Sequence, residues 1–406
     1  MINIAVLGYG TVGSGVVEVI NTNGKRINQR IGEELNVKYV LDMKDFPNDP
    51  VQEKIVHDFE TIIQDDDVKI VVEVMGGIEP AYTFVKRSLL AGKSVATSNK
   101  ALVAKHGAEL LSIAKEQNIN FLFEASVGGG IPIIRPLNSS LTADEIEEIT
   151  GILNGTTNYM LTKMFYEGAN YDEVLKEAQA NGYAERNPEA DVEGYDACRK
   201  IAILSSLISG QQVDFEDIYC EGITKVTVED MKYAKAMGTT IKLLASSKRR
   251  DDRLQAIVAP CMLYPEHPLA SVNDVFNAIF VHGNVLGDAM FYGSGAGKLP
   301  TASAVVADVV DAAKHLNRNI MTMWDQEKLI LQDKADAKRR FFVRMKGDAE
   351  EMLPKLQYSF GEIELVKVPE LTGEFGFVTP VMMEGDYDTR ATRFGEQILH
   401  MIRIEE

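Results

Sequence analysis

Cysteine is scarce in this chain of 406 residues, which contains only Cys198, Cys220 and Cys261. Three dispersed thiols are too few, and odd in number, for a disulfide framework, and their spacing does not fit a zinc site. The 6 histidines are dispersed as well, and no two stand at the spacing of metal ligands. A transition-metal site built on histidine is therefore not expected.

Positive charge and long apolar runs are lacking too. The chain has 42 Lys and Arg against 60 Asp and Glu, a net charge of −18, and such a surface repels the phosphates of nucleic acid. No apolar run is long enough to span a bilayer, and the first residues, MINIAVLGYG, lack the charged segment and cleavage site of a signal peptide. We expect a cytoplasmic protein that binds neither nucleic acid nor membrane.

A glycine-rich turn follows the first predicted strand, residues 3–7, and leads into a predicted helix, residues 12–20. The turn reads Gly8-Tyr9-Gly10-Thr11-Val12-Gly13, which is the GxGxxG pattern. Glycines at these places allow a tight turn and the close approach of a pyrophosphate, which rests on the helix N-terminus. Such turns also occur without ligands, but directly after an N-terminal strand the pattern favours a dinucleotide site.

The second predicted strand, residues 37–41, ends in Asp42-Met43-Lys44-Asp45. An acid at this point binds the ribose 2′-hydroxyl of NAD, whereas a base suits the 2′-phosphate of NADP. Asp42 fits the first role and Lys44 the second, so these residues leave the choice open.

Strands and helices alternate as far as residue 130. Predicted strands 69–74, 94–96 and 120–123 are separated by predicted helices 79–90 and 101–116, which is typical of a parallel sheet. Ligands of such sheets lie beyond the carboxyl ends of the strands, where Gly76, Lys100 and Glu124 stand. Lys100 lies near a helix start, where the dipole disfavours a cation, and this favours a function over a plain surface lysine.

From residue 146 the pattern changes to runs of strands with flanking helices, which predicts an α+β domain. A helix over residues 191–209 places Asp196 and Lys200 on one face, at the mouth of an apolar segment. Such a pair is commonly a surface ion pair. Here Glu185, Glu189, Asp191 and Glu193 crowd upstream, which indicates a site for an ammonium group with a lysine beside it.

Two late segments complete the chain. A second glycine-rich turn, residues 293–301, precedes a helix that runs to residue 316; it either returns the chain to the cofactor domain or is a plain loop. After a charged stretch, residues 332–340, the elements follow the order βαββαβ over residues 341–404, which predicts a ferredoxin-like unit, with a turn at residues 384–386.

The motifs GYGTVGSGV, TSNK, FEASVGGGIPI, GILNGTTNYML, GYAERNPEADVEGYDACRK and GSGAGKLPTA, in this order, resemble homoserine dehydrogenase over residues 1 to about 320. The C-terminal unit resembles the ACT regulatory domain. The fold expected is thus an α/β Rossmann dinucleotide-binding domain (1–130, completed by 293–320), an α+β catalytic and dimerisation domain (131–320), a linker (321–340) and a ferredoxin-like, ACT-like βαββαβ domain (341–406).

The resemblance implies NAD(P)-dependent interconversion of L-homoserine and L-aspartate 4-semialdehyde, in threonine and methionine biosynthesis. It assigns acid–base catalysis to Lys200, with Lys100 and Asp191 in the active site, and substrate binding to Glu185 and Asp196. It implies NADP or NAD as cofactor, with NADP favoured, and a homodimer or homotetramer. The cofactor-binding residues implied are Gly8, Gly10, Thr11, Val12, Gly13, Gly76, Lys100, Gly182 and Gly297.

The resemblance also implies a site for a monovalent cation such as Na⁺, formed by Glu124 and the carbonyls of Val127, Gly129 and Ile131; oxygen ligands alone suit a hard cation. In the C-terminal unit, residues 346–351 lack the Pro-Gly turn of ligand-binding ACT loops, so threonine binding is not expected there.

Two rival hypotheses stay open from the sequence. Aspartate-semialdehyde dehydrogenase needs a nucleophilic thiolate, and Cys198 lies beside Lys200 but has no histidine near it in sequence. A non-catalytic amino-acid-sensing homologue would share the fold, and the intact set of Lys100, Glu185, Asp196 and Lys200 disfavours it.

Overall fold

The structure, a computed structural model, describes residues 1–250 and 253–405. The chain divides into two compact units. Unit 1 comprises Met1–Glu145, Ala202–Phe215 and Phe291–Leu329, and unit 2 comprises Ile146–Ile201, Glu216–Met290 and Ile330–Glu406. Within the described residues, no helix has both the length and the apolar character needed to cross a membrane.

A parallel sheet forms the centre of unit 1, with its described strands in the order β3-β2-β1-β4-β5-β6. Runs of Ile, Val and Leu make up β1 and β4, and Ile4, Val6 and Val71 have no exposed surface. Strands buried on both faces require such runs. The strands are β1 (Ile2–Leu7), β2 (Leu35–Leu41), β3 (Ile55–Val56), β4 (Val68–Glu73), β5 (Ser94–Thr97) and β6 (Phe121–Leu122).

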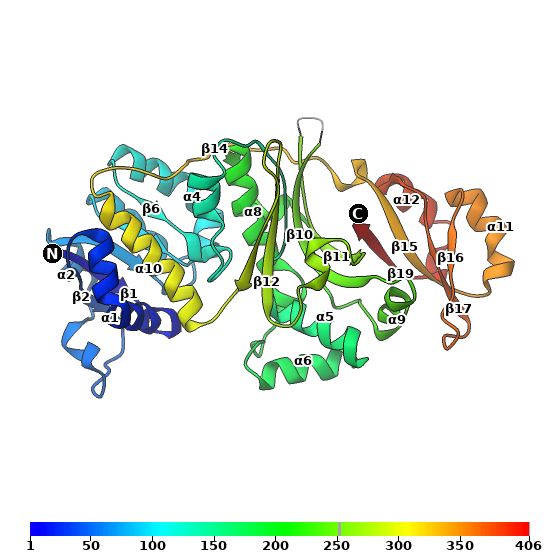
Figure 1. The fold of residues 1–406 in the computed structure, drawn as a ribbon, viewed down its shortest axis with the longest axis horizontal. Helices are drawn as coiled ribbons and strands as arrows, with labels where there is room; N and C mark the ends of the chain where they lie inside the picture. The colour runs from blue at the N-terminus through cyan, green and yellow to red at the C-terminus, as the bar shows by residue number, and fades with distance from the viewer. Residues whose placement is uncertain (251–252, 406) are drawn as a thin grey trace. The chain divides into compact units, whose positions relative to one another are not determined.

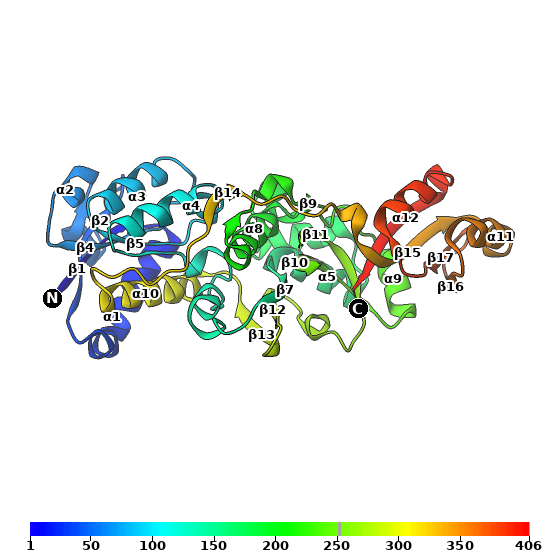
Figure 2. The ribbon, with the colours of Figure 1, turned by 90° about the horizontal axis from the view of Figure 1, so that it is seen from above.

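Helices cover both faces of this sheet (Figures 1 and 2). In Figure 2, α3 and α4 lie on one side of it and α1 and α10 on the other. A Cβ on Gly15 of α1 would lie 2.9 Å from the carbonyl oxygen of Lys298, so glycine lets α10 pack closely against α1. The chain therefore returns to unit 1 with the second glycine-rich turn. The helices of unit 1 are α1 (Thr11–Ile31), α2 (Phe59–Ile63), α3 (Ala81–Leu90), α4 (Lys100–Glu116) and α10 (Lys298–Lys314).

A short parallel pair joins two distant segments of unit 1. Strand β14 (Asp325–Lys328) pairs with β8 (Gln211–Gln212). The indole of Trp324 donates a 2.8 Å hydrogen bond to Gln212 and is 2% exposed. A Cβ on Gly107 of α4 would collide with this indole, so a glycine is required there.

Unit 2 contains most of a larger sheet, in the order β13-β12-β7-β10-β11-β19-β15-β17-β16. Strand β10 pairs antiparallel with β7 and β11, as an α+β domain requires. The first strands along the chain are β7 (Ile146–Ile152), β9 (Tyr219–Cys220), β10 (Thr240–Arg250), β11 (Arg253–Leu263), β12 (Phe276–Gly283) and β13 (Gly287–Ser294).

The prediction of a single helix over residues 191–209 is wrong in one respect, because the helix is interrupted at Gly194. A φ of +82° at Gly194 separates a short helix from a long one. Asp191 thus belongs to the short helix, while Asp196 and Lys200 lie on the long one. The helices are α5 (Gly155–Glu167), α6 (Tyr171–Ala180), α7 (Glu189–Val192), α8 (Tyr195–Ser209) and α9 (Val228–Ala236).

The C-terminal residues fold as the predicted βαββαβ pattern, with antiparallel strands in the order β19-β15-β17-β16. This is the order of a ferredoxin-like sheet. The expected turn at residues 384–386 is wrong, since a helix begins there. The elements are β15 (Lys338–Lys346), α11 (Ala349–Phe360), β16 (Glu364–Val366), β17 (Glu374–Val378), β18 (Met382–Met383), α12 (Glu384–Ala391) and β19 (Ile398–Glu405).

One pairing was not predicted from the sequence. Strand β19 pairs in parallel with β11, with Cys261 opposite Arg403 and Leu263 opposite Glu405. The C-terminal elements therefore continue the central sheet of unit 2.

Candidate active site

The turn between β1 and α1 is shaped by two glycines. Gly8 has a φ of +98°, and a Cβ on it would lie 3.1 Å from Met75. A Cβ on Gly13 would collide with the carbonyl oxygen of Gly8. The helix N-cap is Gly10, which has no side chain to satisfy the first N–H groups, so these can take an anion. The exposed positions Gly10 and Thr11 and the partly buried Val12 complete a cradle that fits a pyrophosphate.

Asp42 follows β2 directly and is bound to this turn. Its Oδ2 accepts a 2.8 Å hydrogen bond from the N–H of Tyr9, and its Oδ1 accepts one of 3.0 Å from the N–H of Lys44. The carboxylate is thus held at the edge of the glycine-rich turn, and the Lys44 side chain lies exposed.

The carboxyl ends of β4 and β5 place Gly76 and Lys100 at the same edge of unit 1. Glu73 is buried, and it accepts hydrogen bonds from the Thr97 hydroxyl (2.6 Å) and the Met75 N–H (2.8 Å). Burial raises the pKa of Glu73. These bonds fix the loop in which Gly76 adopts a φ of +81°. Lys100 is partly buried and opens α4, one residue after the N-cap Asn99.

Two further glycine-rich loops of unit 1, at residues 128–130 and 293–297, contact each other. The N–H of Gly130 donates to the carbonyl of Ser294 at 3.1 Å, and a Cβ on Gly129 would collide with the carbonyl of Gly295. Gly297, with a φ of +115°, is the N-cap of α10 and is exposed. Only glycines permit this approach of two backbones.

The proposed cation ligands differ in how well they fit a cation. Val127, Gly129 and Ile131 are buried, and within the described residues no backbone N–H donates to their carbonyls. The Glu124 carboxylate, by contrast, accepts the N–H groups of Ile133 (2.6 Å), Ile134 (2.9 Å) and Arg135 (2.7 Å). Carbonyl oxygens are the type of ligand that a hard cation takes, whereas the Glu124 carboxylate accepts two N–H groups on Oε1 and one on Oε2.

In unit 2 the predicted pair of Asp196 and Lys200 is present and is not a surface ion pair. Lys200 Nζ lies 2.7 Å from Asp196 Oδ2, and the two side chains are 10% and 6% exposed. Lys200 Nζ also donates a 2.7 Å hydrogen bond to the carbonyl of Leu153, at the end of β7. The ammonium group is therefore fixed by one charged and one neutral oxygen.

Asn154 joins the acids of α7 and α8, a role that was not predicted from the sequence. Its Nδ2 donates to Asp191 (2.8 Å) and to Asp196 (3.1 Å), and its Oδ1 caps α5 by accepting the N–H of Thr157. The signal was an N-cap asparagine directly after an apolar strand, in GILNGTT. Asp191, Asp196 and Lys200 are thus brought together.

Glu185 and Gly182 lie in the exposed loop between α6 and α7. Gly182 has a φ of +74°, and the backbone carbonyl of Glu185 accepts a bond from Gln179. The Glu185 carboxylate is exposed, so the structure does not join it to the buried pair.

Cys198 has the properties of a structural thiol. It is 2% exposed, and its hydrogen bond with Cys220, together with burial, raises the pKa of its thiol. A nucleophilic cysteine requires a stabilised thiolate, so this environment speaks against the thioester chemistry of the first rival hypothesis.

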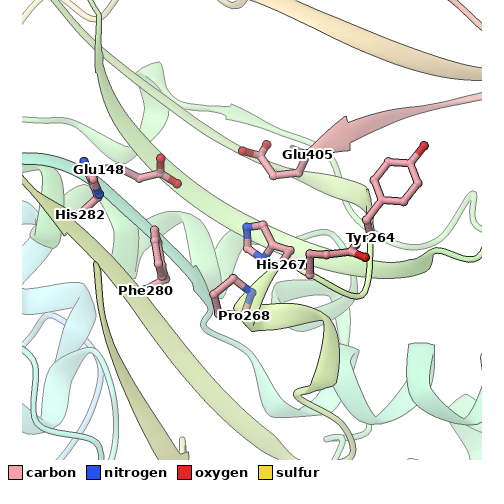
Figure 3. A pocket seen from close by; sticks show the side chains of 8 residues that line it. Glu148, Tyr264, His267, Pro268, Phe280, His282 and Glu405 are labelled. Atoms are coloured by element: carbon pink, nitrogen blue, oxygen red, sulfur yellow. The ribbon is translucent and has the colours of Figure 1, made fainter. Parts of the chain in front are cut away.

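A separate pocket of about 630 Å³ lies on the sheet of unit 2 (Figure 3). None of the predicted site residues lines it. Its Glu148 and Glu405 both pair with Lys248, whose side chain is partly buried. The lining residues are Glu148, Tyr264, Glu266, His267, Pro268, Phe280, His282 and Glu405.

Comparison with known proteins identifies the relatives of this chain. Two family models match it: one described as homoserine dehydrogenase, NAD binding domain, over residues 8–124, and one described as homoserine dehydrogenase over residues 132–310. The homoserine dehydrogenase of Bacillus subtilis is 43% identical over 79% of this chain and 74% of its own length.

Solved structures give the same result. A homoserine dehydrogenase from Thiobacillus denitrificans matches 100% of this chain and 98% of its own with a TM-score of 0.90 at 33% identity. A hyperthermophilic archaeal homoserine dehydrogenase in complex with NADPH matches 77% of this chain and 97% of its own, with a TM-score of 0.66 at 31% identity.

Proposed function

This chain belongs to the homoserine dehydrogenase family and is an NAD(P)-dependent oxidoreductase that interconverts L-homoserine and L-aspartate 4-semialdehyde; from this premise we propose which of its side chains carry the reaction. The observation that supports the assignment is the buried pair of Asp196 and Lys200, anchored to the Leu153 carbonyl. The alternative of a non-catalytic amino-acid sensor is not favoured.

Lys200 is proposed as the acid–base residue. An ammonium group has three N–H donors, and two of them point to Asp196 and to the Leu153 carbonyl. The third is assigned to the reacting oxygen of the substrate. In the direction of reduction, Lys200 gives its proton to the oxygen as the carbonyl becomes an alkoxide; in the reverse direction it takes the proton from the hydroxyl of homoserine.

The acids of unit 2 are proposed to hold the substrate. Glu185 and Asp196 bind the α-ammonium group by charge-assisted hydrogen bonds, and Asp191 lies near the reacting centre, oriented by Asn154. Lys100 is proposed as the second active-site lysine. In this proposal Asn154 is a positioning residue, because it contacts Asp191 and Asp196.

The cofactor is proposed to bind through the cradle of unit 1, with Gly8, Gly10, Thr11, Val12 and Gly13 at the pyrophosphate. Gly76, Lys100, Gly182 and Gly297 are assigned to the remainder of the dinucleotide. When bound, the nicotinamide supplies or accepts the hydride.

The role of Lys200 is tested by Lys200→Met, measured as NAD(P)-linked absorbance at 340 nm with L-homoserine. We expect turnover to fall by about 10² or more, since an acid–base group typically contributes 10²–10⁴. Binding of reduced cofactor, followed by its fluorescence, should be unchanged.

Lys163→Met is the matched control, because Lys163 forms an i,i+4 pair with Glu167 at the same 2.7 Å distance, but the two side chains are 24% and 54% exposed. It should retain turnover. Full activity of Lys200→Met would overturn the assignment.

A monovalent cation is proposed to bind the carbonyls of Val127, Gly129 and Ile131. Because Glu124 is held by three N–H groups, its carboxylate is proposed to shape the loop through them. Replacing Na⁺ by a bulky organic cation at constant ionic strength should lower the melting temperature. No change would contradict a bound ion.

The C-terminal elements are proposed to form an ACT-like domain, as their strand order supports. Because residues 346–351 lack the Pro-Gly turn, L-threonine is expected to leave the kinetics unchanged. The domain boundaries, the homodimer or homotetramer and the cytoplasmic location stay predictions; light scattering after gel filtration tests the assembly.

A further inference from the structure

Asp42 places a fixed negative charge at the end of β2. Asp42 follows Leu41, the last residue of β2, and its two carboxylate oxygens accept the N–H groups of Tyr9 and Lys44. Its backbone is fixed as well: its N–H donates to the Val56 carbonyl at 3.2 Å, and its carbonyl faces His57 Nδ1 at 2.7 Å. Two hydrogen bonds hold the carboxylate and two hold the backbone of Asp42, so the side chain has little freedom to turn away from the glycine-rich turn.

This is the position at which a dinucleotide-binding sheet reads the adenine ribose. A carboxylate oxygen has two lone pairs, and each oxygen of Asp42 uses one of them for a backbone N–H. Each oxygen therefore keeps one for a ribose hydroxyl. A 2′-phosphate at the same place has no proton to offer and would bring about two negative charges against the carboxylate.

The charged groups that follow Asp42 closely in the chain are mostly acidic as well. Asp45 and Asp49 lie on the same segment, and Asp49 accepts a 3.0 Å bond from the Tyr9 hydroxyl. His57 Nε2 lies 3.3 Å from Asp45, so the charge that His57 carries when protonated is matched by that carboxylate. Residues 35–65 contain no arginine, the side chain whose planar fork binds phosphate in two places.

Lys44 is the basic residue that the sequence offered for a 2′-phosphate. Its backbone N–H is bound to Asp42, and its side chain is exposed. Lys44 offers one positive charge on a flexible side chain. It stands beside three acids, since Asp42, Asp45 and Asp49 all lie within seven positions of one another in the chain. The relative solved with NADPH does not decide the matter for this chain.

We propose that Asp42 is a specificity-determining residue and that it selects NAD over NADP. This reverses the preference for NADP that the resemblance favoured. The inference rests on the nicotinamide cofactor of the proposed function and deepens it.

Direct binding tests the proposal without turnover. Fluorescence titration of the full-length protein with NADH and NADPH at low ionic strength should give a dissociation constant about tenfold or more lower for NADH, a difference of about 1.4 kcal/mol. The ratio should shrink at high salt, since screening weakens the repulsion. Tighter binding of NADPH would overturn the proposal.

Asp42→Asn removes the charge and keeps the shape. We expect the preference for NADH to fall by about tenfold, mainly because NADPH binds more tightly. Asp45→Asn is the matched control: it removes the same charge from the same segment and should shift the ratio by no more than about twofold. An unchanged ratio in Asp42→Asn, or an equal shift in both variants, would overturn the role of Asp42.

Absorbance assays with L-homoserine separate this proposal from the function itself. If NADH binds preferentially but neither dinucleotide supports oxidation, the assigned reaction fails and the preference stands. If NADP⁺ supports a higher kcat/KM than NAD⁺, the reaction stands and the preference fails.

Discussion

Lys242 of β10 makes the stability of the fold depend on pH. Its side chain is 1% exposed, and its Nζ donates to the Asn158 amide oxygen, the Val272 carbonyl and the Asn273 amide oxygen. Burial lowers the pKa of Lys242 from 10.5 to about 8. Between these two values the unfolded chain binds more protons than the fold, so stability increases with pH across that window and is flat below it.

The pH dependence of Lys242→Met tests this. From pH 8 to pH 10 the free energy of unfolding of the parent should rise relative to the variant, by up to about 3 kcal/mol at about 1.4 kcal/mol per pKa unit. Urea unfolding at several pH values measures the difference. Lys115→Met, at an exposed position of α4, should run parallel to the parent. A constant difference between parent and Lys242→Met would show that Lys242 does not titrate in this range.

At the scale of elements, the break between α7 and α8 separates Asp191 from Asp196. Gly194 has a φ of +82°, and a Cβ there would lie 3.1 Å from both Cys220 Sγ and Val258 Cγ1. Gly194→Ala should therefore lower the free energy of unfolding by about 1–3 kcal/mol and shift Asp191 away from Asn154. We expect a lower melting temperature and a lower kcat/KM for homoserine.

Gly24→Ala is the control for this prediction. Gly24 lies inside α1, and a Cβ on it would meet nothing within 4 Å. Alanine should stabilise the helix by up to about 1 kcal/mol and leave the kinetics unchanged. If both variants behaved alike, the special geometry of Gly194 would have no consequence.

The same two helices show what the sequence could and could not predict. The i,i+4 spacing of Asp196 and Lys200 depends only on helix geometry, and the structure confirms that pair. The parallel sheet of unit 1 was likewise predicted from the alternation of strands and helices, and the structure confirms it. At Gly194 a Cβ would press on Cys220 and Val258, which are distant in sequence, so local periodicity could not predict this constraint. The bond from Asn154 to Asp191 spans 37 positions and was missed for the same reason.

At the scale of the whole molecule, the sequence pattern could not predict the pairing of β19 with β11, because it assigned the two strands to separate domains. Ion pairs of a β19 side chain add to this strand pairing. Arg403 of β19 is 1% exposed and bonds to Glu384 (2.6 Å) at the start of α12 and to Glu221 (2.8 Å) after β9. One buried guanidinium thereby joins the C-terminal elements to the residues that flank β9.

Arg403→Met tests how much this ion-pair cluster contributes to the free energy of unfolding. Glu384 is fully buried, and losing Arg403 leaves a buried charge that is offset only in part, by Lys334 at 3.1 Å and by Arg339 at 3.8 Å. The free energy of unfolding should fall by about 3–5 kcal/mol, measured by urea unfolding with circular dichroism. Arg340→Met is the control, since its partner Glu364 is 72% exposed, and it should cost less than about 1 kcal/mol.

The double variant Arg403→Met with Glu384→Met separates the loss of a partner from the loss of packing. Because both charges are then absent, most of the stability should return, as replacement of a buried pair by apolar groups is often neutral. If the double variant were as unstable as Arg403→Met, packing around Arg403 would carry the effect. The cycle therefore decides whether charge pairing or apolar contact joins β19 to the sheet.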